Sequence, residues 1–284
     1  MHIEILGSGG AVSAPRPFCS CRVCSEARTR GVPYSRGGPS LFVHGPDLLV
    51  DTPEDILSAL ERSQVQHVAV GTYSHWHPDH VMGLRLWETL NGDWMRWPPQ
   101  PRATPLYFPQ RVAADIRDKL GVWESFDFMQ QRGLIELVEL ADNESFQSNG
   151  YTITPLQLAE QYMYAQIIEG DGKRVFIAAD ELFGWQPSPA LGSFDLAVLP
   201  LGVAEHNPLT GERHYPLEHP VLQREATIAQ TLEIARSLDA RQTVLTHISE
   251  PEQLGYDDLL AFEKELRQNG LNIAFAYDTM IVPA

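Results

Sequence analysis

The stretch SHWHPDHVMG, residues 74–83, limits more than any other what this chain can fold into. It places His75, His77, Asp79 and His80 within six consecutive positions. Burying imidazoles and a carboxylate this close together is costly unless they find partners. Neutral imidazole and carboxylate are ligands that suit zinc, manganese and iron(II). The spacing therefore favours a divalent-metal site over a polar helix cap with chance histidines.

The local pattern around this motif predicts how the ligand-type side chains converge. Residues 67–73 read as a β-branched strand, and His75 and His77, two positions apart, point the same way in extended chain. Pro78 suits the first turn of a helix, which we expect to run to about Leu90. The last two ligand-type residues of the motif fall in that turn. Two metals roughly 3.5–4 Å apart could share such ligands, with a bridging hydroxide as nucleophile.

The rest of the chain alternates predicted strands and helices, which indicates an α/β fold in a single domain, residues 1–284. A Pro-rich stretch, 91–105, reads as an irregular loop that is either a lid or pinned to the surface by its tryptophans. The predicted strands are 2–6, 41–44, 48–51, 134–140, 151–158, 164–169, 173–179, 195–201, 242–246, 272–276 and 279–282. Further helices are predicted at 53–62, 227–238 and 257–268.

Composition narrows the function classes. The chain has 37 acidic and 21 basic residues and a net charge of −16. Nucleic-acid binding needs a basic face, so this charge disfavours a nucleic-acid partner. Five arginines between residues 16 and 36 read as a solvated loop or as a rim that steers anions. No signal peptide and no apolar run of roughly 18 residues is evident, so we expect a cytoplasmic protein without a membrane partner. Three cysteines, all within CSCRVC, suit a metal knuckle at about 16–36 better than disulfides.

The motif from His75 to His80 resembles the signature of the metallo-β-lactamase-fold hydrolases. The resemblance implies an αββα four-layer sandwich of mixed sheets and a binuclear active site. It also implies a role for three residues that end predicted strands. Asp51 in LLVD would orient a ligand histidine, Asp180 in FIAAD would bridge the metals, and His247 in VLTHIS would be the last histidine ligand.

Within this family the sequence is most similar to the phosphoribosyl cyclic phosphate phosphodiesterases of phosphonate breakdown. The shared features are the Gly-rich turn LGSGGAV, the ending LTHIS, and the Cys-x-Cys-x-x-Cys knuckle of Cys19, Cys21 and Cys24. The resemblance implies a phosphodiesterase acting on a small cyclic or diester phosphate, with zinc, manganese or iron at the active site and one structural zinc at the knuckle. It leaves open whether the chain forms a homodimer.

Three positions depart from the family pattern. Where relatives have a histidine after the strand ITPLQL, this chain has Glu160, which either ligates metal and favours manganese or iron, or is an exposed loop residue. At the start of the helix near residue 227, Glu225 lies nearest to where relatives have a histidine that assists the leaving group; it either takes over that role or is simply an acidic residue favourable at a helix N-terminus. The acid could instead come from the loop histidines, His214 among them (with His206 and His219). Glu250 stands where relatives have the histidine that is the fourth zinc ligand of the knuckle. The knuckle is therefore either a zinc site with three cysteines and one glutamate or a cluster of free cysteines.

The catalytic candidates are therefore Asp79, Glu225 and His214, and the metal-ligand candidates are His75, His77, Asp79, His80, Glu160, Asp180 and His247. Two other function classes remain open. One is an accessory or biosynthetic metal-binding protein of the same fold, which the departures at Glu160 and Glu225 keep in view. The other is a diiron oxidoreductase, although relatives of that class typically have Glu where this chain has His77.

Overall fold

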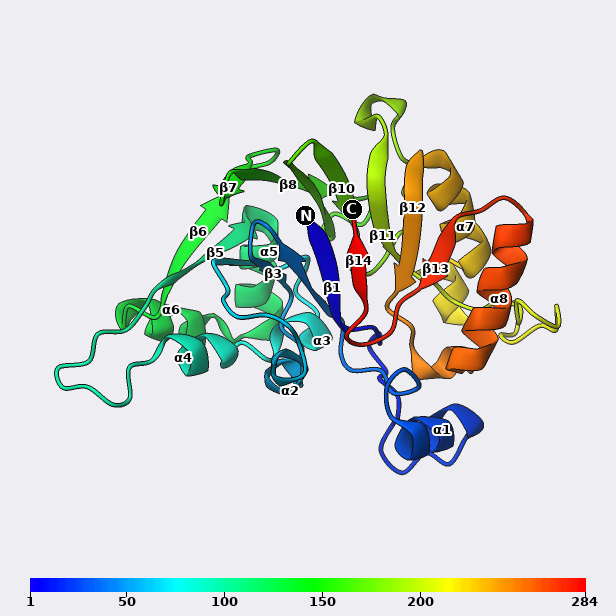
Figure 1. The fold of residues 1–284 in the computed structure, drawn as a ribbon, viewed down its shortest axis with the longest axis horizontal. Coiled ribbons are helices and arrows are strands. Elements are labelled where there is room, and N and C mark those ends of the chain that lie inside the picture. Colours follow the sequence, from blue (N-terminus) through cyan, green and yellow to red (C-terminus); the bar gives the residue numbers. More distant parts are fainter.

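The computed structural model describes residues 1–284 and contains two seven-stranded mixed sheets that face each other (Figure 1). The first sheet has the strand order β14-β1-β2-β3-β4-β5-β6 and the second β13-β12-β11-β10-β9-β8-β7. The strands of the first sheet are β1 His2–Gly7, β2 Ser40–His44, β3 Leu48–Val50, β4 Val70–Thr72, β5 Thr104–Pro109, β6 Ile135–Leu140 and β14 Ile281–Pro283. Those of the second are β7 Phe146–Ser148, β8 Tyr151–Gln157, β9 Tyr164–Gly170, β10 Lys173–Ile177, β11 Phe194–Pro200, β12 Ala240–Thr246 and β13 Ile273–Phe275.

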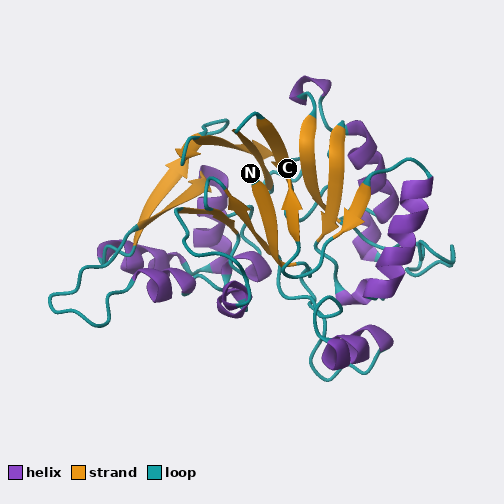
Figure 2. Ribbon diagram, viewed as in Figure 1, coloured by secondary structure: helices purple, strands orange, loops and turns teal.

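Helices cover the outer face of each sheet, so the predicted αββα sandwich is confirmed (Figure 2). One apolar cluster joins the first sheet to α2–α6, and another joins the second sheet to α7 and α8. A third, which contains Ile5, Val50, Ile168 and Val198, fills the space between the sheets. The helices are α1 Arg22–Arg30, α2 Ile56–Glu61, α3 Pro78–Val81, α4 Leu86–Asn91, α5 Gln110–Asp115, α6 Trp123–Gln131, α7 Ile228–Ser237 and α8 Tyr256–Gln268. Shorter turns are a π-helical turn Ile116–Leu120 and 3₁₀ turns Pro189–Leu191, Pro220–Gln223 and Glu250–Glu252.

In each sheet the parallel strands run from the middle of the sheet to one edge. Strands β3, β4, β5 and β6 run parallel in the first, and β10, β11, β12 and β13 in the second. Strand β11 is apolar and almost wholly buried, as expected for a strand covered on both faces. Parallel strands present their carboxyl ends at one edge, and ligands of open α/β sheets bind there.

The single helix predicted from Pro78 to about Leu90 is wrong, because the structure breaks it into α3 and α4. Gly83 lies between them, and its amide donates to the carbonyl of Thr52 at 2.8 Å. A Cβ at Gly83 would lie 2.0 Å from the carbonyl oxygen of Pro53. The loop after β3 therefore takes over the backbone hydrogen bonds at this point and ends the first helix after four residues.

The basic segment of residues 16–36 neither lies free in solvent nor lines the cavity described below. Helix α1 projects below the sheets in Figure 1 and is held to the segment before and within α8. Arg22 pairs with Asp258 at 2.5 Å and Arg30 with Asp257 at 3.1 Å. The segment is therefore docked by its own arginines onto acidic residues far along the chain.

The Pro-rich loop between α4 and β5 extends away from the body of the molecule, at the left of Figure 1. Trp94 is 70% exposed and Trp97 94% exposed, so the tryptophans do not pin it to the surface. None of the helices combines the length and the apolar character needed to cross a membrane.

Candidate metal centre and cavity

Four of the expected site residues lie just after strands whose carboxyl ends meet at one edge of the sandwich. Asp51 follows β3, His75 lies beyond β4, Asp180 beyond β10, and His247 directly follows β12. Asp51 and His247 have φ of 63° and 55°, in the left-handed region that non-glycine residues rarely occupy. Such strained residues concentrate at functional sites, where the surrounding structure holds them.

The motif and the strand ends form two groups of ligand-type atoms. His75, His77 and Asp180 make one group, and Asp79, His80 and His247 make the other. Asp180 lies between them: its Oδ2 is 3.2 Å from His75 Nε2, and its Oδ1 is 3.4 Å from His247 Nε2. The arrangement places one carboxylate where it can reach two neighbouring ions.

Asp51 fixes the orientation of one histidine in each group. Its Oδ2 lies 2.7 Å from His80 Nδ1 and accepts the hydroxyl of Ser74 at 2.6 Å. Since that hydroxyl proton is directed at Asp51, the Ser74 oxygen is free to accept from His75 Nδ1, which is 3.0 Å away. Both rings then carry their proton on Nδ1. The unprotonated Nε2 of His75 faces Asp180, and that of His80 faces Asp79.

Several buried atoms of these two groups have no hydrogen-bond partner. His75 Nε2, His80 Nε2, His247 Nε2 and Asp79 Oδ2 are buried and make no hydrogen bond. An orphaned buried polar atom costs free energy, and such atoms are rare in native structures. Four converging on one place is the pattern expected when metal ions complete the site, so the residues fit divalent metals such as zinc, manganese or iron.

The protonation preferences of the site follow from its burial and charges. Burial lowers the pKa of His75 to about 4, which keeps the imidazole neutral and able to ligate. Burial also lowers the pKa of His80, but the carboxylates of Asp51 and Asp79 outweigh it and raise that pKa well above its usual value when no metal is bound. Burial raises the pKa of Asp180, yet His247 and His75 hold it well below the usual carboxyl range.

A cavity of about 470 Å³ opens onto both groups. Its metal-side wall includes His77, Asp79, Asp180 and His247. Gly10 of the Gly-rich turn lies against His247, where a Cβ would lie 2.7 Å from its Nδ1, and the next two residues of the turn, Ala11 and Val12, line the cavity. The other polar residues that line the cavity are Tyr162, Glu181, Tyr215, Arg224, Glu225, Ser249 and Glu252, of which Arg224 and Glu225 come from the loop before α7.

The remaining candidates from the sequence lie in different places. Glu225 lines the cavity, as expected of a leaving-group acid, and desolvation together with the charge of Asp180 raises its pKa. His214 is not part of the cavity wall: it is exposed, and its Nε2 lies 2.8 Å from the carbonyl of Pro251, which its N–H satisfies. The structure therefore does not bring His214 to the cavity as an acid, and its ring instead links one loop to another.

Glu160 belongs to neither ligand group. It starts the tight turn between β8 and β9, in which its carbonyl accepts the amide of Met163 at 2.8 Å. The ring that this turn brings to the histidines is that of Tyr162, whose centroid is 5.4 Å from that of His77. The structure therefore does not bring Glu160 to the position of the expected metal ligand.

Tyr162 and Glu181 are two of the cavity residues that were not foreseen from the sequence. Tyr162 lies in AEQYMY, where nothing in the local pattern separates it from an ordinary surface tyrosine. Glu181 follows Asp180, and burial raises its pKa to about 7. Its Oε1 accepts the amide of Ala226 at 2.8 Å, which ties the end of β10 to the start of α7. An acid beside an expected metal ligand, in FIAADE, is the one signal that could have drawn attention to it.

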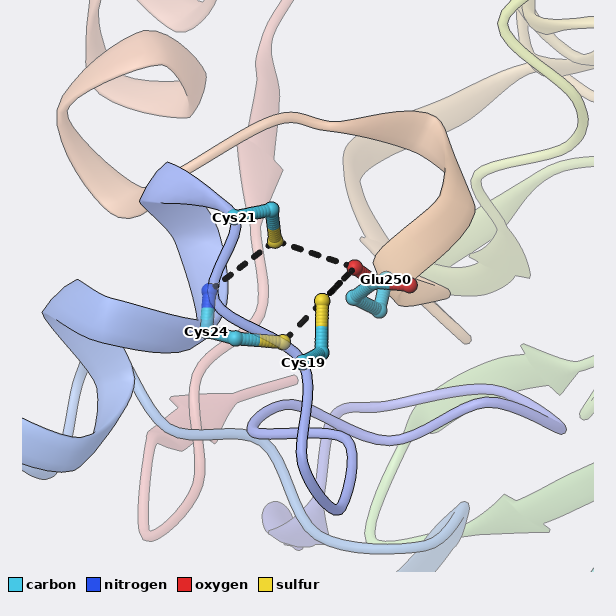
Figure 3. Close-up of side chains that lie close together, drawn as sticks. All are labelled: Cys19, Cys21, Cys24 and Glu250. Atoms are coloured by element: carbon cyan, nitrogen blue, oxygen red, sulfur yellow. Dashed lines mark hydrogen bonds between the residues drawn. The ribbon is translucent and has the colours of Figure 1, made fainter.

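Figure 3 shows a third cluster, outside the cavity wall, formed by Cys19, Cys21, Cys24 and Glu250. The Glu250 Oε1 lies 3.0 Å from the sulfur of Cys21, 3.3 Å from that of Cys19 and 3.6 Å from that of Cys24. The other oxygen, Oε2, is 3.5 Å from Arg16 Nε. One oxygen of a buried carboxylate therefore faces three thiols, which is the donor set expected for a tetrahedral zinc.

Comparison with known proteins identifies the family of this chain. A family model described as a β-lactamase superfamily domain matches residues 45–248, and the chain belongs to this superfamily. The family expected from the motif at residues 75–80 is thereby confirmed. A search of curated protein sequences gives no significant match.

Solved structures with the same fold include a diphosphatase from the PhnP family, with a TM-score of 0.72 and 22% identity over 100% of this chain and 97% of that one. Zn²⁺-bound PqqB from Methylobacterium extorquens has a TM-score of 0.72 and 16% identity, with 100% of both chains covered. The short form of human tRNase Z has a TM-score of 0.64 and 17% identity, over 100% and 99%. At these identities the likeness concerns the fold.

Proposed function

We propose that this protein is a binuclear metal-dependent hydrolase that cleaves a small phosphodiester or cyclic phosphate. The observation that carries the proposal is the pair of ligand groups that share Asp180 at the floor of one cavity. His75, His77 and Asp180 would hold one ion, and Asp79, His80 and His247, with Asp180 between, the other. Bound divalent metal there supplies Lewis acidity toward phosphoryl oxygens and lowers the pKa of a coordinated water.

The size of the cavity supports a small substrate. Its volume of about 470 Å³ falls in the range of small-molecule sites, roughly 300–1,000 Å³. Carboxylates outnumber arginine and lysine in its wall, and the whole chain carries a net charge of −16. Both features disfavour a long polyanion such as tRNA, even though one of the proteins with this fold is a tRNase Z.

Two carboxyl groups would handle the protons. Hydrolysis adds one water across the P–O bond, so one proton leaves the water and one reaches the departing oxygen. Glu225 faces the cavity with a raised pKa and would give its proton to the departing oxygen. Asp79, at the floor, would belong to its metal-holding group and also hold the proton that the water gives up.

The cysteine knuckle is a separate candidate site for metal. We infer that Cys19, Cys21, Cys24 and Glu250 hold one structural zinc. Glu250 lies three residues after His247, so a zinc here would fasten residues 16–36 to the short segment that follows a metal-holding residue. The role is one of stability at the rim of the cavity, not of chemistry.

The test is turnover of bis(p-nitrophenyl) phosphate by protein loaded with manganese, zinc or iron(II). We expect release of p-nitrophenol that is lost on chelation and restored by metal. His77→Ala should abolish it, whereas His2→Ala, which changes a histidine at the start of β1 that lies outside the cavity wall and both ligand groups, should not. Protein that holds its active-site metals but turns over no phosphodiester would instead be an accessory protein. Metal-dependent oxygen consumption by the iron-loaded form would indicate the oxidoreductase class.

A further inference from the structure

The turn that carries Tyr162 is fixed against the histidine motif. Within it, the amide of Leu158 donates to the carbonyl of Met163 at 2.9 Å, and that of Met163 donates to Glu160 at 2.8 Å. The next residue, Tyr164, donates its amide to the carbonyl of Ser74 at 3.1 Å. Because Ser74 directly precedes His75, this bond ties the end of the turn to the strand end that positions the first ligand group.

The ring of Tyr162 lies against that group. Its centroid is 5.4 Å from the ring of His77 and 6.1 Å from that of His75, with interplanar angles of 43° and 41°. Tyr162 is half-buried and lines the cavity together with His77 and Asp180. The side chain is therefore beside the position where a phosphoryl group would meet the metal held by His75, His77 and Asp180.

The hydroxyl of Tyr162 has no hydrogen-bond partner in the chain. The other tyrosine of the cavity, Tyr215, is already committed, because its hydroxyl donates to Glu252 at 3.3 Å. Partly buried tyrosine hydroxyls usually find a partner. An uncommitted donor that faces a cavity is available to a ligand.

The cavity has a shortage of such donors. Asp79, Asp180, Glu181, Glu225 and Glu252 contribute carboxylates to its wall, and these repel phosphoryl oxygens unless protonated or bound to metal. Arg224 is the only arginine or lysine in the wall, and it belongs to the loop before α7. Tyr162 is thus the neutral donor on the side of His75 and His77.

Resting on the proposed function, we propose that the Tyr162 hydroxyl donates a hydrogen bond to a non-bridging phosphoryl oxygen of the bound substrate. Negative charge on those oxygens is what a phosphoryl-transfer site must stabilise. Tyr162 would therefore act in the place that the sequence suggested for a ligand, but as a donor to substrate and not as a ligand to metal.

The experiment compares wild type, Tyr162→Phe and the control Tyr107→Phe, each loaded with metal. Tyr107 lies on β5, where its ring stacks on Phe146 at 4.0 Å, and it does not line the cavity. Three quantities are measured: metal content, the Kd of inorganic phosphate by calorimetry, and turnover of bis(p-nitrophenyl) phosphate. Thermal unfolding confirms that each variant is folded.

We expect Tyr162→Phe to keep its metal while its phosphate Kd rises about tenfold or more, as for the loss of a hydrogen bond to a charged group. Turnover should fall about 100-fold, and Tyr107→Phe should match wild type. A Tyr162→Phe phosphate Kd within twofold of wild type would overturn the inference alone. Loss of metal from Tyr162→Phe would also overturn it, since the phenol would then be a ligand. Metal-loaded wild type that neither binds phosphate nor turns over would refute the proposed function, and this inference with it.

Discussion

Replacing Asp51 by Asn should weaken the binding of both metals of the proposed centre. Asp51 would not itself touch a metal, because it contacts His80 at Nδ1, the ring nitrogen that points away from the site. The carboxylate accepts from the amide of Ser74 at 2.7 Å and from its hydroxyl at 2.6 Å, and it faces His80 Nδ1 at 2.7 Å. If the side-chain oxygen of the new asparagine still accepts the hydrogen bond from the backbone N–H of Ser74, the side-chain NH₂ of the asparagine points at His80 Nδ1. Two donors then face each other, and His80 must move its proton to Nε2, the atom needed for metal.

The effect reaches the other group through Ser74. Its hydroxyl would turn to accept from the Asn NH₂ and could then donate to His75 Nδ1, which again shifts a proton toward Nε2. Loss of a carboxylate that orients a ligand histidine typically costs about 10–100-fold in metal affinity. That corresponds to about 1.4–2.7 kcal/mol for each ion. Since Asp51 supports one histidine in each group, we expect the loss at both positions.

Competition with a chromophoric chelator measures the affinities, and elemental analysis after desalting gives the stoichiometry. Asp278→Asn is the matched control, because Asp278 is also buried and accepts from the amide and hydroxyl of one serine, Ser8, at 2.9 and 2.8 Å. It contacts no histidine of the centre, so we expect lower stability but unchanged active-site affinity. Wild-type affinity for both active-site metals in Asp51→Asn would falsify the tautomer argument.

Three further outcomes are expected. Glu160→Gln should leave metal affinity within twofold of wild type in the same chelator competition, because Glu160 lies outside both groups; a marked loss would restore it as a ligand. Cys21→Ser should release one zinc per chain and lower the unfolding temperature, as elemental analysis and thermal unfolding will show, with part of the turnover retained. Glu225→Gln should lower kcat about 100-fold while phosphate binding and metal content stay as in wild type, because only proton donation is removed; an unchanged kcat would exclude Glu225 as the acid.

The motif and the strand ends could be predicted because each is specified locally. A strand, a proline at a helix start and ligand-type residues at fixed spacing suffice to bring the residues of 75–80 together. Asp51, Asp180 and His247 each end a predicted strand, and the family resemblance supplied their order. Glu250 was likewise placed by its spacing from His247. These residues needed no knowledge of side-chain contacts from elsewhere in the chain.

What escaped prediction depends on contacts between distant segments. The break at Gly83 is caused by the loop after β3, which lies some thirty residues earlier and takes over its amide. Tyr162 and Glu160 lie two positions apart in one turn, and only the path of that turn decides which faces the histidines. His214 was indistinguishable in sequence from a free loop histidine until Pro251 proved to be its partner.

The arginines of residues 16–36 are a similar case, since their acidic partners lie more than 200 residues away. The sequence offered a solvated loop or a rim for anions, and both interpretations treated the charges as facing outward. The short elements β5 and α5, which the sequence did not reveal, are defined by their contacts within and against the first sheet more than by their own periodicity. Helix α1, also not predicted, is held instead by the segment before and within α8.

The docking of the knuckle onto Glu250 also sets the order in which the molecule can be completed during synthesis. The sulfurs of Cys19 and Cys21 meet a carboxylate 231 and 229 residues later in the chain, and Ser8 bonds to Asp278 across 270 residues. At a translation rate of about 5–20 residues per second, the cysteines emerge roughly 10–50 s before their partner exists. Strand β1 likewise waits for β14 at the edge of its sheet. The nascent chain must therefore carry three unpaired thiols while about 230 further residues are added, so the yield of intact protein should depend on how well those thiols are kept reduced.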